Sequence, residues 1–163
     1  MKYILISALS LFIHFNTFCQ SDKIPPIKQL SALQGKWNIY DAQSDFIGHN
    51  QYVFSSKSDQ LVEENIDRSG LSSKGMFFQI PGSNNFVYTV NPDMPGKSLQ
   101  YQSDTDAHLF SFQGLENTDG TIIMERLTYN LISNDTVQKK YETSTDNGQS
   151  WTLEYLENMK RMN

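Results

Sequence analysis

The sequence is poor in cysteine, in clustered basic residues and in long apolar runs, and each shortage excludes a class of protein. Its one cysteine, Cys19, lies in an N-terminal segment that we expect to be removed. The mature chain then has no disulfide, no cysteine nucleophile and no thiolate metal site. Lys and Arg number 13 against 18 Asp and Glu, and they form no basic stripe, so nucleic acid is disfavoured as a partner.

The N-terminal segment, residues 1–19, is typical of a secretory signal peptide. Lys2 precedes the apolar run Ile4–Ile13, and cleavage is predicted after Cys19. A transmembrane anchor is the alternative, but this run is too short to span about 30 Å of hydrocarbon. A lipoprotein modified at Cys19 is a further alternative, which Asn16 and Phe18 disfavour. We expect a secreted or periplasmic protein without stable membrane insertion and with one domain, residues 20–163.

The domain is predicted to begin with a short helix from Pro26 to Leu33, ended by Gly35. Short β-branched and aromatic runs follow, separated by turn dipeptides such as Pro95-Gly96 and Asn147-Gly148. The predicted strands are Lys36–Ala42, Gln51–Ser56, Gln60–Asp67, Lys74–Ile80, Phe86–Val90, Ser98–Gln102, His108–Leu115, Thr121–Ile132, Thr136–Thr145 and Ser150–Met159. Closing such an antiparallel meander removes its exposed edges. The expected fold is therefore all-β, an up-and-down barrel of about ten strands with a short N-terminal helix.

The turn before the last predicted strand has the pattern S-x-D-x-G-x-x-W, from Ser144 to Trp151. Asp146 is expected to accept hydrogen bonds from the turn backbone, and Gly148 to take a positive φ. Trp151 is expected to anchor the returning strand and to share one face with Leu153 and Tyr155. The pattern resembles the Asp-box of sialidase-like propellers, but a propeller needs several copies and this chain has one.

Two groups of residues carry a resemblance to known barrels. Gly35-Lys36-Trp37 resembles the G-x-W signature of the lipocalin and fatty-acid-binding superfamily. That resemblance implies that Trp37 plugs one barrel end and that Arg161, or less favourably Lys160, packs over it by a cation–π contact. Together with the segments 126–129, 133–136 and 144–151, the motif is similar to a family of bacterial secreted domains of unknown function with lipocalin-like, calycin-type barrels. The resemblance implies a fold and no agreed activity.

The sequence gives little support for a metal or a cofactor, and we expect neither. His49 lies in the polar stretch Gly48-His49-Asn50, which we interpret as an exposed link. Asp104, Asp106 and His108 alternate and would share one face of an extended segment, but a solvated acidic loop is the favoured interpretation. Haem-binding barrels of similar shape hold the haem through a histidine near the C-terminus. No histidine follows His108, so haem is disfavoured.

Charged residues within the predicted strands are the remaining candidates for chemistry. If Glu63 or Glu157 faced inward with Tyr129, the pair would suit acid–base chemistry or anion binding. The favoured interpretation is an ion pair on the outer face. Alternation sends one of Glu125 and Arg126 inward. Half of the strand aromatics are expected inside, where they would line a pocket or fill the core.

Three functions stay open. The leading hypothesis is a barrel that binds a small, partly apolar ligand, hydrophobic or sugar-like, at Trp37, Tyr129, Glu157 and Arg161, in a pocket on the order of a few hundred Å³. The second is a cofactor-free lyase, isomerase or hydrolase, which predicts converging interior titratable groups with shifted pKa values. The third is a non-catalytic accessory of an envelope or polysaccharide-processing system, with a filled barrel and an exposed apolar patch.

Overall fold

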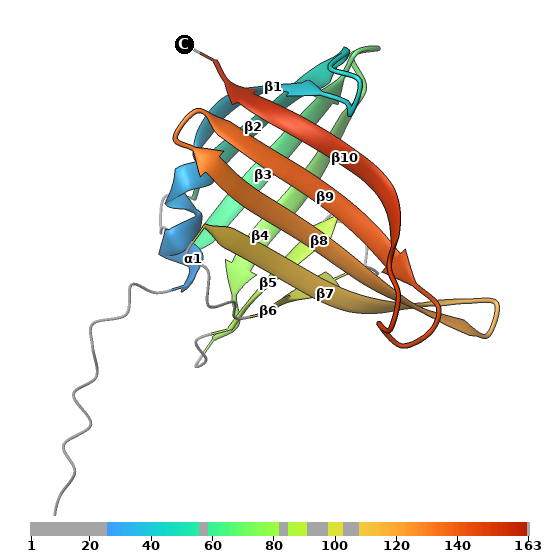
Figure 1. Ribbon diagram of the computed structural model, residues 1–163. Helices are drawn as coiled ribbons and strands as arrows, with labels where there is room; N and C mark the ends of the chain where they lie inside the picture. Colours follow the sequence, from blue (N-terminus) through green and yellow to red (C-terminus); the bar gives the residue numbers. More distant parts are fainter. Residues whose placement is uncertain (1–25, 56–58, 82–84, 91–97, 103–107, 163) are drawn as a thin grey trace, which may run out of the picture.

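The computed structural model describes residues 26–55, 59–81, 85–90, 98–102 and 108–162, which form a closed antiparallel β-barrel (Figure 1). Each of the ten strands pairs with its neighbours in sequence, and the first closes the barrel by pairing with the last. The predicted all-β, up-and-down barrel is therefore confirmed. The predicted signal peptide, residues 1–19, lies outside the described residues. No helix in the described ranges is long and apolar enough to cross a membrane.

The elements follow one another with short connections. Helix α1 (Pro26–Gln29) continues into the 3-10 turn η1 (Leu30–Leu33). The strands are β1 (Gly35–Tyr40), β2 (Phe46–Phe54), β3 (Gln60–Asp67), β4 (Ser72–Gln79), β5 (Phe86–Val90), β6 (Ser98–Gln102), β7 (Leu109–Thr118), β8 (Thr121–Ser133), β9 (Thr136–Ser144) and β10 (Thr152–Arg161).

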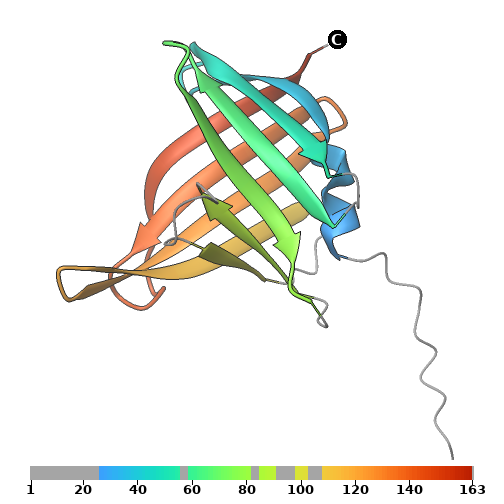
Figure 2. The ribbon, with the colours of Figure 1, turned by 180° about the vertical axis from the view of Figure 1, so that it is seen from behind.

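The N-terminal helical segment covers one end of the barrel, which we call the closed end (Figure 2). The side chains of Ile27, Leu30 and Leu33 are buried against the barrel core. The indole N–H of Trp37 donates a hydrogen bond of 2.7 Å to the carbonyl of Leu33. This bond fixes the segment onto the start of β1. We call the opposite end of the barrel the mouth.

Aromatic side chains fill much of the interior. Phe112 lies at their centre, with its ring centroid 5.3 Å from that of Phe77 and 6.4 Å from that of Tyr129 in tilted and edge-on contacts. The buried strand aromatics are Trp37, Tyr52, Phe77, Phe86, Tyr88, Phe110, Phe112 and Tyr129. More than the expected half of the strand aromatics therefore faces inward.

The β9–β10 turn has the predicted chemistry. Asp146 accepts hydrogen bonds from the Ser150 backbone N–H at 2.9 Å and from the hydroxyl of Ser144 at 2.7 Å. Gly148 has φ +81°, a left-handed conformation that side chains disfavour. The hydrogen bonds from Ser150 and Ser144 lower the pKa of Asp146 to about 2. The turn is thus held by its own local contacts.

The predicted faces of the last strand are partly wrong. A register shift between Leu153 and Tyr155 places Leu153 opposite Glu142 on the outer surface, while Tyr155 stays opposite the inward Tyr141. A bulge of this kind adds a residue to one strand and so changes which side chains share a face. Trp151 likewise lies outside the core, where the guanidinium carbon of Arg126 is 4.0 Å from its ring centroid.

The interpretation of Gly48-His49-Asn50 as an exposed link is also wrong. These residues belong to β2, where Asn50 pairs with Trp37 on one side and Asn65 on the other. Asn50 is buried, and half-buried His49 packs on the ring of Phe46 with centroids 4.9 Å apart. A polar residue is tolerated at an inward strand position here because it finds a polar partner inside the barrel.

Candidate functional site

A group of polar side chains lies buried in the middle of the barrel, centred on the Glu63 carboxylate. Glu63 Oε1 accepts hydrogen bonds from Asn50 Nδ2 at 2.9 Å, from the Tyr52 hydroxyl at 2.8 Å and from Lys139 Nζ at 3.0 Å. Glu63 Oε2 accepts one from the Tyr88 hydroxyl at 2.7 Å. Glu63 is only 2% exposed and Lys139 5%. We call these five residues the buried cluster.

The strand order explains how the buried cluster assembles. On β3, Glu63 lies opposite Tyr52 of β2 and opposite Gly75 of β4. A Cβ added at Gly75 would lie 2.5 Å from the Tyr88 hydroxyl, so glycine is what lets Tyr88 reach Glu63 from β5. Lys139 comes from β9, which is not a neighbour of β3 in the sheet. The ion pair therefore crosses the interior and depends on barrel closure.

The electrostatics fix the charge state of the buried cluster. Burial raises the pKa of Glu63, but the Lys139 ammonium and three hydrogen bonds outweigh burial, so the net pKa is lowered. Burial lowers the pKa of Lys139, and the Glu63 carboxylate outweighs that effect and raises the pKa. Burial, reinforced by Glu63, raises the pKa values of Tyr52, Tyr88 and Tyr129. The pair stays ionised and the phenols stay neutral near pH 7.

Two of the predicted ligand-binding residues, Tyr129 and Glu157, flank Lys139. Tyr129 of β8 and Glu157 of β10 are its register partners on either side. The Lys139 ammonium lies 5.7 Å from the Tyr129 ring centroid and 3.7 Å from Glu157 Oε2. The favoured outer-face placement is therefore wrong for Glu63, which is wholly inside, and Glu157 also faces the interior.

Three buried polar atoms around Lys139 have no hydrogen-bond partner among the residues that the structure describes. They are Asn50 Oδ1, the Tyr129 hydroxyl and Glu157 Oε2. Buried polar atoms are nearly always hydrogen-bonded to protein, water or a ligand. The buried cluster and its neighbours Tyr129 and Glu157 thus have free capacity for hydrogen bonds, most of it as acceptors.

An acidic and aromatic group lies between the buried cluster and the mouth. Glu125 of β8 is buried, and the Tyr141 hydroxyl of β9 donates a short hydrogen bond to it. The Tyr141 ring stacks on Tyr155 of β10, with centroids 5.2 Å apart and planes at 19°. Tyr155 is 40% exposed. Alternation sends Glu125 inward, as expected for one of the two residues, while its neighbour Arg126 bonds Glu142 on the outer face at 2.9 Å.

The other two predicted residues, Trp37 and Arg161, lie together at the closed end. The guanidinium carbon of Arg161 is 4.2 Å from the Trp37 ring centroid. This is the cation–π contact that the resemblance implied for Arg161. Lys160, the alternative, lies over the ring of Tyr40. Arg161 and Glu157 are four residues apart on β10, about 13 Å along an extended strand. The structure therefore does not bring the four predicted residues into one site.

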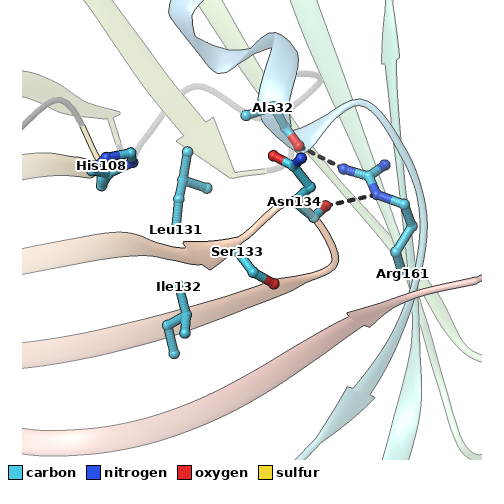
Figure 3. Close-up of a pocket in the computed structure, with 7 residues that line it drawn as sticks. All are labelled: Ala32, His108, Leu131, Ile132, Ser133, Asn134 and Arg161. Carbon is cyan, nitrogen blue, oxygen red and sulfur yellow. Dashed lines mark hydrogen bonds between the residues drawn. The ribbon is translucent and has the colours of Figure 1, made fainter.

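Arg161 ties three segments together at the closed end. Its guanidinium donates hydrogen bonds to the carbonyls of Gln34 at 2.7 Å, Ala32 at 2.9 Å and Asn134 at 2.9 Å. Figure 3 shows it pointing toward Ala32 and Asn134. These bonds join η1, the start of β1 and the β8–β9 turn. Most of the hydrogen-bonding capacity of Arg161 is thus committed to structure.

Pockets are present on the surface of the barrel. One at the closed end has a volume of about 410 Å³ and is lined by Ala32, His108, Leu131, Ile132, Ser133, Asn134 and Arg161 (Figure 3). Another, about 390 Å³, is lined by Ser98, Gln100, Gln113, Gly114, Leu115 and Met124 on the outer face of β6, β7 and β8. Neither pocket includes a residue of the buried cluster.

Within the described ranges, no group of three or more His, Cys, Asp or Glu residues is placed to hold a metal ion. Asp104 and Asp106, considered above with His108, lie outside those ranges.

Asn50, Tyr52, Tyr88 and Lys139 were not predicted as site residues. A signal for Lys139 was present, because it shares strand parity with the apolar residues Val137 and Tyr141. Glu63 likewise shares parity with Leu61. The alternation of the strands therefore indicated that both charges face inward. The outer face was favoured because burying a charge is generally costly.

Comparisons with known proteins add little to this description. No family model matches the chain, and no curated protein matches it. A solved structure of a redesigned β-barrel is similar over 83% of this chain and 96% of its own, with 12% sequence identity and a TM-score of 0.38. A likeness at that level carries no argument about fold or function.

Proposed function

We propose that this protein is a secreted or periplasmic, lipocalin-like barrel that binds a small, partly apolar ligand between the buried cluster and the mouth. The observation that carries the proposal is the group of three buried polar atoms around Lys139 that lack hydrogen-bond partners in the described structure. The stacked rings of Tyr141 and Tyr155 supply apolar surface on the mouth side of that group. Small-molecule sites combine apolar walls with a few convergent polar groups in this way.

Binding is favoured over catalysis by the directions of the pKa shifts. Titratable groups do converge in the interior, as the enzyme hypothesis requires. A general acid or base works best with a pKa near the working pH. Here the pKa of Glu63 is lowered and those of Lys139, Tyr52 and Tyr88 are raised, all away from neutrality. Such groups hold fixed charges and dipoles toward a ligand and exchange protons poorly.

A specific observation also favours the accessory function. Leu115, Ile122 and Leu153 are exposed by 68%, 58% and 51%. Leu115 and Ile122 lie on the β7–β8 hairpin, and Leu153 lies on the outer surface of β10. Exposed apolar groups of this kind are typical of contact surfaces. Self-association or partner capture that is lost in Leu115→Ser would favour this second candidate. A monodisperse monomer at all concentrations would count against it.

Native mass spectrometry tests the binding function directly. The mature protein, isolated from the envelope of its own host, is expected to retain a small molecule that is released on denaturation. Glu157→Gln is expected to reduce the retained fraction, because Glu157 Oε2 is one of the three unpartnered atoms. Glu154→Gln is the matched control, since Glu154 lies on the same strand and bonds Thr143 at the exposed surface.

The proposal fails if the wild-type protein retains nothing and also binds no compound from a library of small amphiphiles. It fails equally if Glu157→Gln and Glu154→Gln reduce retention to the same degree, because the ligand would then not bind beside Glu157.

A further inference from the structure

We propose that the ligand carries a protonated amine or a similar small organic cation, an inference that rests on the proposed function. Its basis is the balance of charge and hydrogen-bonding groups inside the barrel. Around Lys139, the described residues present two carboxyl groups, Glu63 and Glu157, against its single ammonium.

Lys139 is committed mainly to Glu63. The separation of 3.0 Å, with a hydrogen bond, is that of a close ion pair. Glu157 Oε2 lies farther from the same ammonium, at 3.7 Å, and makes no hydrogen bond within the described structure. Glu157 is therefore only partly compensated. A second cation beside it would remove the excess of negative charge from a poorly solvated position.

The unpartnered atoms fit an ammonium better than an anion. Asn50 Oδ1 and Glu157 Oε2 accept hydrogen bonds and cannot donate them, and both are buried. The Tyr129 hydroxyl accepts as well as donates. An ammonium offers three donors and no acceptor. A carboxylate in the same place would face two oxygen acceptors without a donor from either.

Aromatic rings lie between the buried cluster and the mouth. Tyr141 and Tyr155 stack on one another beside Glu125, and Tyr155 is partly exposed. The faces of such rings attract cations, by about 0.5–2 kcal/mol depending on desolvation. Lys139 already lies over the face of Tyr129 inside the same barrel. The aromatic walls and the carboxyl groups thus select the same class of ligand.

The test uses three probes that share one hydrocarbon group: 2-phenylethylamine, 2-phenylethanol and phenylacetate. Isothermal titration of the mature wild-type protein at pH 7 is expected to show the amine binding at least about tenfold more tightly than the alcohol, and phenylacetate not binding. Glu157→Gln is expected to weaken the amine about tenfold or more and to leave the alcohol unchanged. Glu154→Gln is expected to bind all three probes as the wild type does.

The outcomes separate this inference from the proposed function. Equal or tighter binding of the alcohol or of phenylacetate overturns the amine inference and leaves the binding function standing, as does a retained host molecule that has no basic nitrogen. Failure of all three probes at millimolar concentration, together with no retained host molecule, overturns both.

Discussion

The ion pair between Glu63 and Lys139 offers a stringent test of the structure, because the loss of stability on removing one partner is large only if the pair is buried. Glu63→Gln preserves the size of the side chain and removes the charge that faces the Lys139 ammonium at 3.0 Å. Lys139 is then left 5% exposed, with Glu157 at 3.7 Å as its nearest carboxylate. An ammonium in that position is poorly solvated and poorly paired.

The expected cost is large. Removing one partner of a buried pair costs about 3–5 kcal/mol, against a total stability of about 5–15 kcal/mol for most domains. Lys139→Met is expected to cost less, because Glu63 keeps its hydrogen bonds from Asn50, Tyr52 and Tyr88. The double variant is expected to be more stable than the sum of the single effects predicts, because it removes both charges of the Glu63–Lys139 pair together.

The pair also fixes the pH dependence of stability. The pKa of Glu63 is lower in the folded state, so its contribution is present above the unfolded pKa, about 4.3, and is lost as the pH falls through the folded value. The pKa of Lys139 is raised, so its contribution is present below the unfolded pKa, about 10.4, and is lost as the pH rises through the folded value. Glu63→Gln is expected to lose the Glu63 part of the acid-side dependence.

Urea unfolding followed by circular dichroism measures these effects, with equal m-values as the check that the folded state is unchanged. Glu64→Gln is the control, since Glu64 neighbours Glu63 on β3 and faces the other side. Glu64→Gln is expected to change stability by less than about 0.5 kcal/mol. Equal losses of stability in Glu63→Gln and Glu64→Gln would refute the placement of this pair in the core. Additive effects of Glu63→Gln and Lys139→Met in the double variant would refute it as well.

Three further predictions follow from individual contacts. Arg161→Lys is expected to lower stability by about 1–3 kcal/mol in the same urea assay, because lysine cannot reproduce the fork that joins three carbonyls and covers Trp37; unchanged stability would contradict the tie at the closed end. Gly75→Ala is expected to cost about 1–3 kcal/mol, because the new Cβ would lie 2.5 Å from the Tyr88 hydroxyl and 2.9 Å from Glu63 Oε2, whereas Ser73→Ala on the exposed part of β4 is expected to be neutral. Carbon NMR is expected to give Asp146 a pKa of about 2, so that its contribution to stability is present above the unfolded carboxyl pKa of about 3.9 and is lost as the pH falls through the folded value; a pKa near the ordinary carboxyl value in the wild type would contradict the turn geometry. Ser150→Ala is expected to raise the pKa of Asp146, because it removes the hydrogen bond that the Ser150 hydroxyl donates to Asp146 Oδ2.

The local features of this protein could be predicted from its sequence alone. Turn dipeptides and β-branched runs predicted β3, β5 and β6 with their observed bounds. The positive φ of Gly148 and the hydrogen bonds of Asp146 followed from their residue types. The succession of short connections predicted a closed meander. These features depend on neighbours in the chain, which the sequence displays directly.

The candidate site depends on contacts between residues that are far apart in the chain. Glu63 and Lys139 are 76 residues apart and meet only because β1 pairs with β10 and closes the barrel. Asn50 became an interior residue when β2 extended to Phe46, and Leu153 moved to the outer surface through a bulge. A shift of one residue exchanges the two faces of a strand, so a small change in register decides which charges are buried. Whether a charge is tolerated inside depends on its partner, and closure supplied that partner.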